Sequence, residues 1–311
     1  MVKISDPTKT ITLRKLFSAQ MKSRFKSIER AIKRSIVDND CFGLRGESSI
    51  YAIKPPPSDW KEKIIPIEEK RYKFNTSAEK QSLFMQWLNN MIDKSVFQFV
   101  NFPVSPQGTE PVWANMYIDA AYTHGLILGR QRIKNDPLVM ETIEINKDDV
   151  KTDIDSINDY ADTAININRV SILFNRVFTD LKGITGEMDS RISRVLSQAL
   201  IEGWSIPKIA EGIVNRVKAI GLHRATLLAR TEIIRASHLG TIQAYRDAGI
   251  LEVMIEAEWI TARDSRVCSL CAPLDKKIFT LDEIEDAIPV HPNCRCSASP
   301  YVRETQYIFD K

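Results

Sequence analysis

The sequence has no long apolar run, and none approaches the roughly 18 consecutive apolar residues that a membrane-spanning helix needs. Its start lacks the apolar core of a secretory signal, so we expect neither a membrane protein nor a secreted one. Glycine-rich loops for phosphate groups, internal repeats and low-complexity tracts are also missing. The 311 residues, 43% apolar and 27% charged, instead predict a globular protein with a substantial core.

Cysteine and histidine are scarce, with five and four copies, but their distribution is uneven. Four cysteines and one histidine gather near one end of the chain: Cys268, Cys271, His291, Cys294 and Cys296. An extracellular disulfide framework would spread cysteines throughout a short chain. The cluster therefore favours a reducing compartment and a metal site. The remaining cysteine, Cys41, stands alone, and we interpret it as an ordinary free thiol.

The spacing within this cluster is typical of a zinc site. A two-residue gap between cysteines lets both sulfurs of a tight turn reach one zinc ion, and HxxC allows the same from the other side. Five candidates compete for four tetrahedral positions. We expect Cys268, Cys271, His291 and Cys296 to bind zinc, with Cys294 a close rival for the last position. Arg266 and Arg295 would offset the charge of the thiolates.

A structural zinc is favoured over a catalytic one, because these ligands can close the shell without an open position. A nuclease of the HNH type would need a further histidine or asparagine for its catalytic metal, and no histidine follows His291. Asp264 and Asp275 lie nearby, but Asp264 reads as a turn residue that accepts local N–H bonds. The other histidines, His124, His223 and His238, fall in predicted helices. We therefore expect no enzyme activity.

Residues 1–37 carry a net charge of +8, from ten Lys or Arg against two acids, whereas the whole chain carries only +3. Apolar residues recur every three or four positions, which predicts a basic amphipathic helical arm. The apolar face comprises Leu13, Phe17, Met21, Phe25, Ile28, Ile32 and Ile36. One interpretation is a helix packed on the body with a solvated basic face; the other is a contact with DNA phosphates or an acidic partner. The candidate contacts are Lys22, Arg24, Lys26, Arg30, Lys33 and Arg34.

Three consecutive prolines predict an extended linker at 38–75, before a helical body at 76–249. In this body we expect a helix that ends near Gly129, two separate helices at about 169–184 and 190–205, and a long one that ends at Gly249. Small residues, among them Ala229, Ala236 and Gly240, form a stripe on the long helix, so a neighbouring helix can approach closely.

The pattern changes at 250–303. In EVMIEAEWIT every second residue is apolar, which predicts a half-buried strand. KKIFT and ASPYV are two further strand candidates. Thr280 and Glu283 form a capping box for a short helix between them. This stretch would be a zinc-stapled module, followed by a tail at 304–311. The predicted fold class is α+β, a mostly helical body with a small strand-containing C-terminal module.

The runs ARTEIIRASHLGTIQAYRDAGI, EWITARDSRVCSLCAPLDKKIF and HPNCRC closely resemble the C-terminal domain of phage head-morphogenesis proteins, the Mu F-like minor capsid family. The resemblance covers residues 165–302. HPNCRC after a D-S-R-x-C-x-x-C turn is its specific part. Val267 and Lys276 replace a threonine and a glycine of many members, and these departures leave the ligands intact.

The resemblance implies a low-copy structural protein of the virion that is associated with the portal and with procapsid assembly. Other head proteins would be its partners, with phage DNA, during packaging or ejection, as a further contact; neither a membrane nor a small-molecule substrate is implied. It would lie in the host cytoplasm during assembly and then in the virion, in the capsid interior or at the portal vertex. The alternative from the residues is a zinc-knuckle DNA-binding or DNA-processing, nuclease-like protein.

Overall fold

A computed structural model describes residues 6–42, 44, 77–97, 113–142, 163–248 and 255–302. Most of the expected linker and the expected tail lie outside these residues, as does Gly249. The chain divides into two compact units. Unit 1 comprises Met1–Gln20, Phe99–Asp180 and Thr226–Lys311, and unit 2 comprises Met21–Gln98 and Leu181–Ala225. Each unit is described by itself.

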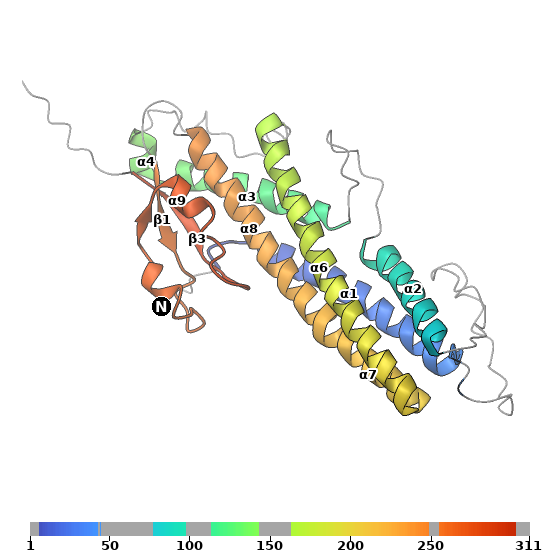
Figure 1. The fold of residues 1–311 in the computed structure, drawn as a ribbon. Helices are drawn as coiled ribbons and strands as arrows, with labels where there is room; N and C mark the ends of the chain where they lie inside the picture. The colour runs from blue at the N-terminus through green and yellow to red at the C-terminus, as the bar shows by residue number, and fades with distance from the viewer. Residues whose placement is uncertain are drawn as a thin grey trace, which may run out of the picture. The chain divides into compact units, whose positions relative to one another are not determined.

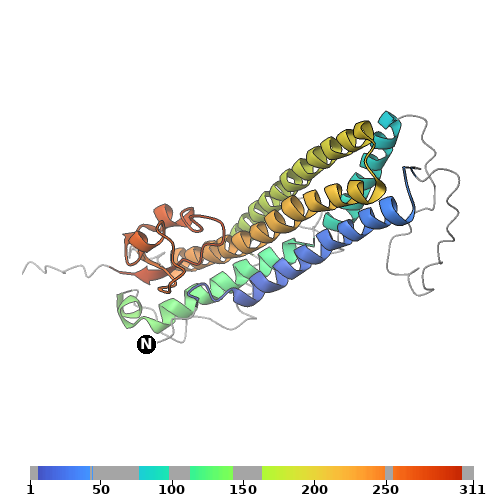
Figure 2. The ribbon, with the colours of Figure 1, turned by 90° about the horizontal axis from the view of Figure 1, so that it is seen from below.

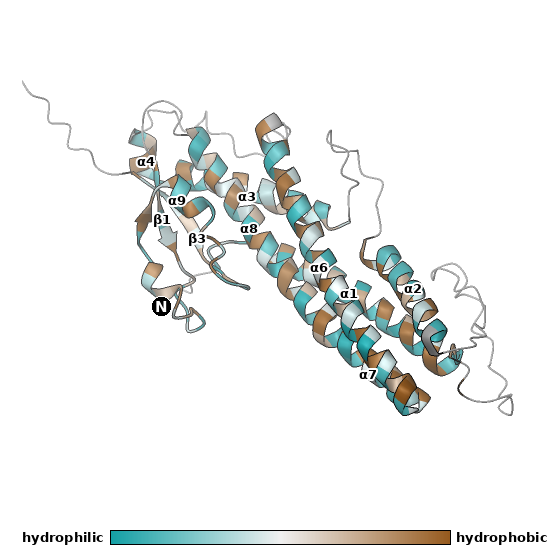
Figure 3. Ribbon diagram, viewed as in Figure 1, coloured by the Kyte–Doolittle hydropathy of each residue, from teal (hydrophilic) through white to brown (hydrophobic). Residues whose placement is uncertain are grey.

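Helices make up most of the described chain, and a small sheet lies near its C-terminal end, which confirms the predicted fold class (Figure 1). None of the described helices is both long and apolar enough to cross a membrane. Along α6 and α8, polar and apolar patches alternate, as expected of helices that bury one side (Figure 3). The helices are α1 (Ile11–Lys33), α2 (Ser77–Val96), α3 (Asn115–Asn135), α4 (Pro137–Thr142), α6 (Ala164–Glu202), α7 (Ile206–Arg216), α8 (His223–Ala248) and α9 (Leu281–Glu285). Short π-helical segments, Arg34–Asp38 and Val217–Leu222, follow α1 and α7.

Helix α6 is continuous, so the prediction of two separate helices in this region is wrong. Gly183 and Gly186 lie inside it, and a glycine costs a helix only about 1 kcal/mol relative to alanine. The buried apolar positions continue in step through these glycines, from Leu181 and Ile184 to Met188. Burial of this stripe outweighs the low helix propensity of the two glycines.

Helices α3 and α8 of unit 1 approach each other closely, as the small-residue stripe predicts (Figure 2). A Cβ atom on Gly240 would overlap the carbonyl oxygen of Tyr122, and one on Gly125 would overlap that of Ser237. Gly129 belongs to the same contact, because its Cα faces the backbone of Thr241. The prediction that Gly129 ends its helix is therefore wrong: α3 continues to Asn135, and this glycine serves packing.

The basic N-terminal segment forms α1, and its apolar face is buried from Phe17 to Ile36. In unit 1, the Phe17 ring stacks on Tyr117 with centroids 4.8 Å apart. In unit 2, Phe25 packs against Gly221, where any side chain would clash with the ring. The helix thus packs through its apolar face, as the interpretation of a helix packed on the body requires. This packing leaves open what its basic face contacts.

The C-terminal sheet has three antiparallel strands in the order β2–β1–β3. They are β1 (Glu256–Ile260), β2 (Ile278–Phe279) and β3 (Ser297–Tyr301). The expected alternation is confirmed, because Ala257 and Trp259 are buried while Glu256, Glu258 and Ile260 are half-buried. The capping box of α9 is also confirmed: the Glu283 carboxylate accepts the Thr280 amide at 2.9 Å, and the Thr280 hydroxyl accepts the Glu283 amide at 3.2 Å.

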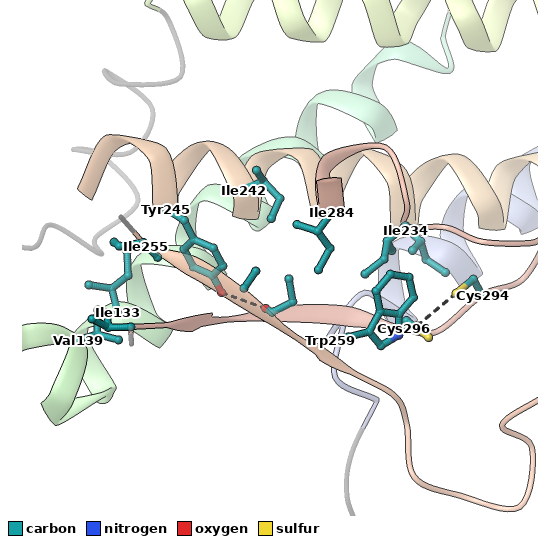
Figure 4. Close-up of a cluster of buried hydrophobic side chains, with 14 of the residues drawn as sticks. Ile133, Val139, Ile234, Ile242, Tyr245, Ile255, Trp259, Ile284, Cys294 and Cys296 are labelled. Carbon is teal, nitrogen blue, oxygen red and sulfur yellow. Dashed lines mark hydrogen bonds between the residues drawn. The ribbon is translucent and has the colours of Figure 1, made fainter. Parts of the chain in front are cut away.

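The module shares its core with helices of unit 1 (Figure 4). Trp259 and Ile284 of the module join one buried cluster with Ile234 and Tyr245 of α8. The Tyr245 hydroxyl donates to the carbonyl oxygen of Ala298 at 3.0 Å. The sheet is therefore anchored on α8 by apolar burial and by this hydrogen bond.

A candidate metal centre in the C-terminal module

Two loops carry the clustered cysteines and the histidine. Cys268 and Cys271 lie in the connection from β1 to β2, just before a 3-10 turn (Ala272–Leu274). His291 and Cys294 lie between α9 and β3, and Cys296 directly precedes β3. Because β1 pairs with β3, with Ile260 opposite Ser297, the two loops lie at the same end of the sheet. Strand pairing thus brings Cys268 and Cys271 close to the segment from His291 to Cys296, which is distant in the sequence.

The ligand atoms converge closely enough for a metal ion. His291 Nε2 lies 3.2 Å from the Sγ atoms of both Cys268 and Cys271. The Sγ atoms of Cys271 and Cys294 are 4.0 Å apart. Two groups of ligand atoms form, one of Cys268, Cys271 and His291 and one of Cys271, Cys294 and Cys296, each within 4.8 Å. On a tetrahedral zinc, Zn–S bonds of about 2.3 Å place two sulfurs about 3.8 Å apart. The set therefore fits a metal that prefers sulfur and imidazole.

The orientation of His291 is set by its other ring nitrogen. Nδ1 lies 2.8 Å from the carbonyl oxygen of Pro292. In the tautomer whose Nδ1–H donates to this oxygen, the lone pair of Nε2 points toward the sulfurs. Metal-binding histidines commonly have such a partner on the second nitrogen, because it fixes the ring and raises its basicity.

The two cysteines that compete for the last position have different surroundings. The backbone N–H of Cys296 donates to the Sγ of Cys294 over 3.5 Å. The Cys296 side chain also hydrogen-bonds this sulfur and lowers the pKa of Cys294 to about 5, while the same contact raises the pKa of Cys296. Cys294 is thus the better thiolate of the two. Burial raises the pKa of Cys271 to about 12, so this cysteine needs a cation nearby to ionise.

Asp264 and Arg295 form an ion pair beside the cluster. Both Arg295 Nη atoms donate to the Asp264 carboxylate at 2.7 Å, and the backbone N–H and side chain of Arg266 bind the same group. These hydrogen bonds, those from Arg295 first, hold the pKa of Asp264 well below its usual range. The local N–H bond confirms Asp264 as a turn residue. Both arginines bind Asp264, and Arg295 also interacts electrostatically with Cys294 and Cys296, as expected of a charge that offsets thiolates.

The second nearby acid is also occupied. Asp275 accepts the backbone N–H of Thr261 at 2.8 Å and the Arg263 Nε at 2.8 Å. The buried His238 lies 2.8 Å from the carbonyl oxygen of Ile284, and burial lowers its pKa to about 4. Each of these groups thus holds a neighbouring segment in place through its hydrogen bonds.

Two structural roles were not apparent from the sequence. The pairing of Asp264 with Arg295 joins the two loops across 31 positions, and local patterns carry no signal for it. Arg132 donates to Ser297 Oγ at 2.8 Å and to the carbonyl oxygen of Pro7 at 2.6 Å, which links α3 to β3 and to the N-terminal segment. No local pattern in the sequence signals this contact.

The basic residues proposed as partner contacts all lie in unit 2 and divide into two kinds. Arg24 donates to the carbonyl oxygen of Ser95 at 2.6 Å, and Lys33 lies 3.3 Å from Glu29. Arg34 is half-buried, whereas Lys22, Lys26 and Arg30 are exposed. The structure thus leaves part of the set on the surface of α1, and a role in binding stays a prediction.

The fold and the cluster together define a class: a mostly helical α+β protein with a cysteine–histidine knuckle at the edge of a small sheet. Residues 190–299 match the family described as Phage Mu protein F like protein. The resemblance to this family is confirmed over that segment, about a third of the chain, and at family level it supports a protein of phage head morphogenesis. No curated protein and no solved structure matches the chain.

Proposed function

We propose that the protein is a minor structural component of a tailed-phage head that acts with the portal and other head proteins during assembly. The observation that carries this proposal is the family match across α8, the sheet and the cysteine–histidine loops. Its place is the host cytoplasm during assembly and the virion afterwards. The thiols of Cys268 and Cys271, which lie beside the His291 ring, are assigned to the proposed metal site, so we propose no catalytic role for them.

The cysteine–histidine cluster, in this proposal, holds one structural zinc ion. Cys268, Cys271 and His291 supply three ligands, and Cys294 supplies the fourth in place of Cys296, the residue that we expected from the sequence. The separation of 4.0 Å between the sulfurs of Cys271 and Cys294 supports this choice, as does the backbone N–H that Cys296 donates to Cys294. Bound zinc would replace the lost thiol protons as the positive partner of these sulfurs.

The head role is tested by removing the protein from its phage. Purified particles should contain the chain at low copy number, and a phage without it should give defective heads while the major capsid protein is still made. Normal, infectious particles that lack the chain would contradict the proposal.

The nuclease-like alternative is tested on the pure protein. We expect no metal-dependent cleavage of DNA. Cleavage that His291→Ala abolishes while the protein stays folded would favour the alternative, and it would require an open position on the metal.

A further inference from the structure

A basic groove lies on unit 2, separate from the metal centre and from the basic face of α1. It has a volume of about 520 Å³ and is formed by α6 and α7. Its lining includes Gly186, Ser190, Arg191, Arg194 and Gln198 of α6 and Arg216 of α7. All three arginines are exposed. The lining contains no lysine, so its positive charge comes from arginine alone.

The one acid of the groove is already neutralised. Glu187 binds Arg191 at 2.6 Å and also binds Arg224 from the start of α8. Arg194 and Arg216 have no acidic partner among the described residues. Four arginines and one carboxylate leave a net charge of +3 on a small surface. Such a surface attracts an anion and leaves two guanidinium groups free to bind it.

The shape of the groove suits an extended anion. Its residues on α6 recur at short helical spacings from Gly186 to Gln198, so they lie along one face of the helix, and a rise of 1.5 Å per residue spreads them over about 18 Å. At Gly186 no atom lies within 4 Å of the position that a Cβ would take, so the groove is open beside the helix backbone. A single small ion would contact only part of this length.

We propose that this groove binds the phosphate backbone of duplex DNA without regard to sequence. Guanidinium groups bind phosphate oxygens through two parallel hydrogen bonds, and Arg194 of α6 and Arg216 of α7 would each bind one phosphate of the backbone. An acidic protein segment fits less well, because protein interfaces are centred on large apolar side chains. In this lining Val195 is the one apolar side chain. The inference concerns the purified chain and stands apart from the proposed head role.

The test is binding of the full chain to a labelled duplex of about 20 base pairs, from about 50 to about 200 mM salt. Each phosphate contact contributes roughly 0.9 to the slope of log affinity against log salt. The double variant Arg194→Gln, Arg216→Gln should reduce the magnitude of this slope by about 1.8 and weaken binding by tens of fold near 0.1 M salt. Both side chains are exposed, so the melting temperature should be unchanged.

Two matched variants make the test specific. Lys276→Gln, Lys277→Gln removes the same charge from exposed positions elsewhere and should change the affinity by less than about twofold. Lys22→Gln, Lys26→Gln removes two positive charges from the basic face of α1 and should weaken DNA binding less than the groove variant does. An equal loss in the control pair, a loss confined to the α1 pair, or wild-type binding by the groove variant would each overturn the proposal. So would arginine-dependent binding of poly-glutamate in place of DNA, which would assign the groove to an acidic protein.

Discussion

The C-terminal module and the helix pair α3–α8, both in unit 1, are held together by different means. The module has short strands, and its two loops converge on the side chains of Cys268, Cys271, His291 and Cys294. The helices instead meet along their length through residues without bulk, such as Gly125 and Gly240. The loops therefore depend on a few atoms, whereas the stability of the helix pair is distributed over many contacts.

The shared core limits how far a defect in the loops can spread. Trp259 and Ile284 are buried against Ile234 and Tyr245, and this burial needs no metal. Loss of the ion should thus release the loops before the sheet, since the sheet keeps its apolar contacts with α8. The proposed metal would therefore order the loops, while the sheet depends on the core that it shares with α8.

The largest effect should follow the loss of a metal ligand. Cys268→Ser should abolish binding of the zinc ion that we expect in about one copy per chain, because structural zinc contributes on the order of 10 kcal/mol of binding free energy. Elemental analysis of purified protein measures the metal, and amide hydrogen exchange should show faster exchange in both loops than in α8.

The matched control is Cys41→Ser, which changes a buried free thiol outside the cluster. It should leave the zinc content unchanged. A wild-type protein without metal whose loop amides are nonetheless protected would contradict the proposed zinc centre.

The second prediction distinguishes the two cysteines of the second loop. Cys294→Ser should lose most of the zinc, because it removes the sulfur that lies 4.0 Å from that of Cys271. Cys296→Ser should retain zinc with reduced affinity, since its backbone N–H still donates to Cys294. Zinc titration of the two variants against a chelator measures the difference. Retention by the first and loss by the second would restore Cys296 as the ligand.

Features with a short repeat could be predicted from the sequence. The alternation around Trp259, the capping box at Thr280 and the apolar stripe of α1 each follow from neighbours within four positions. The convergence of the cysteines and the histidine could also be predicted, although the two halves are far apart in the sequence, because cysteine and histidine at this spacing are typical of a zinc site.

Features that depend on distant contacts could not be predicted. Gly129 has the residue type of a helix end, and only the proximity of Thr241 shows why it lies within α3. Asp264 was recognisable as a turn residue, but its pairing with Arg295 requires the folded sheet. The family that residues 190–299 match was recognisable from its loop motifs, whereas the groove on α6 and α7 became visible only in three dimensions.

An effect of intermediate size should come from the helix pair. Gly240→Ala places a Cβ against the carbonyl oxygen of Tyr122, and the backbone must move apart, which should lower the free energy of unfolding by about 1–3 kcal/mol. Gly183→Ala is the matched control on α6, where no atom lies near the new Cβ. It should raise the stability by up to about 1 kcal/mol, because alanine favours the helix. Urea denaturation measures both, and equal effects of the two variants would argue against close packing of α3 and α8.

The smallest effect concerns one carboxylate on α8. Burial raises the pKa of Asp247 to about 6, above the value of about 3.9 for an unfolded aspartate. The folded state then binds a proton more readily than the unfolded state, so its relative stability decreases as the pH rises from about 4 to about 6 and stays lower above that range.

Asp247→Asn removes this ionisation and keeps an oxygen that can accept the Gln243 Nε2 hydrogen bond, which is 2.8 Å long in the wild type. Because the carboxylate is partly exposed, water screens part of this effect, and we expect the variant to gain about 1 kcal/mol at pH 7 and almost nothing at pH 4. Urea denaturation at the two pH values measures this difference, with Asp93→Asn, an exposed carboxylate on α2, as the control. A variant that is no more stable than the wild type at pH 7 would show that Asp247 is stabilised by its surroundings. The helix pair would then tolerate a buried charge that its packing is expected to resist.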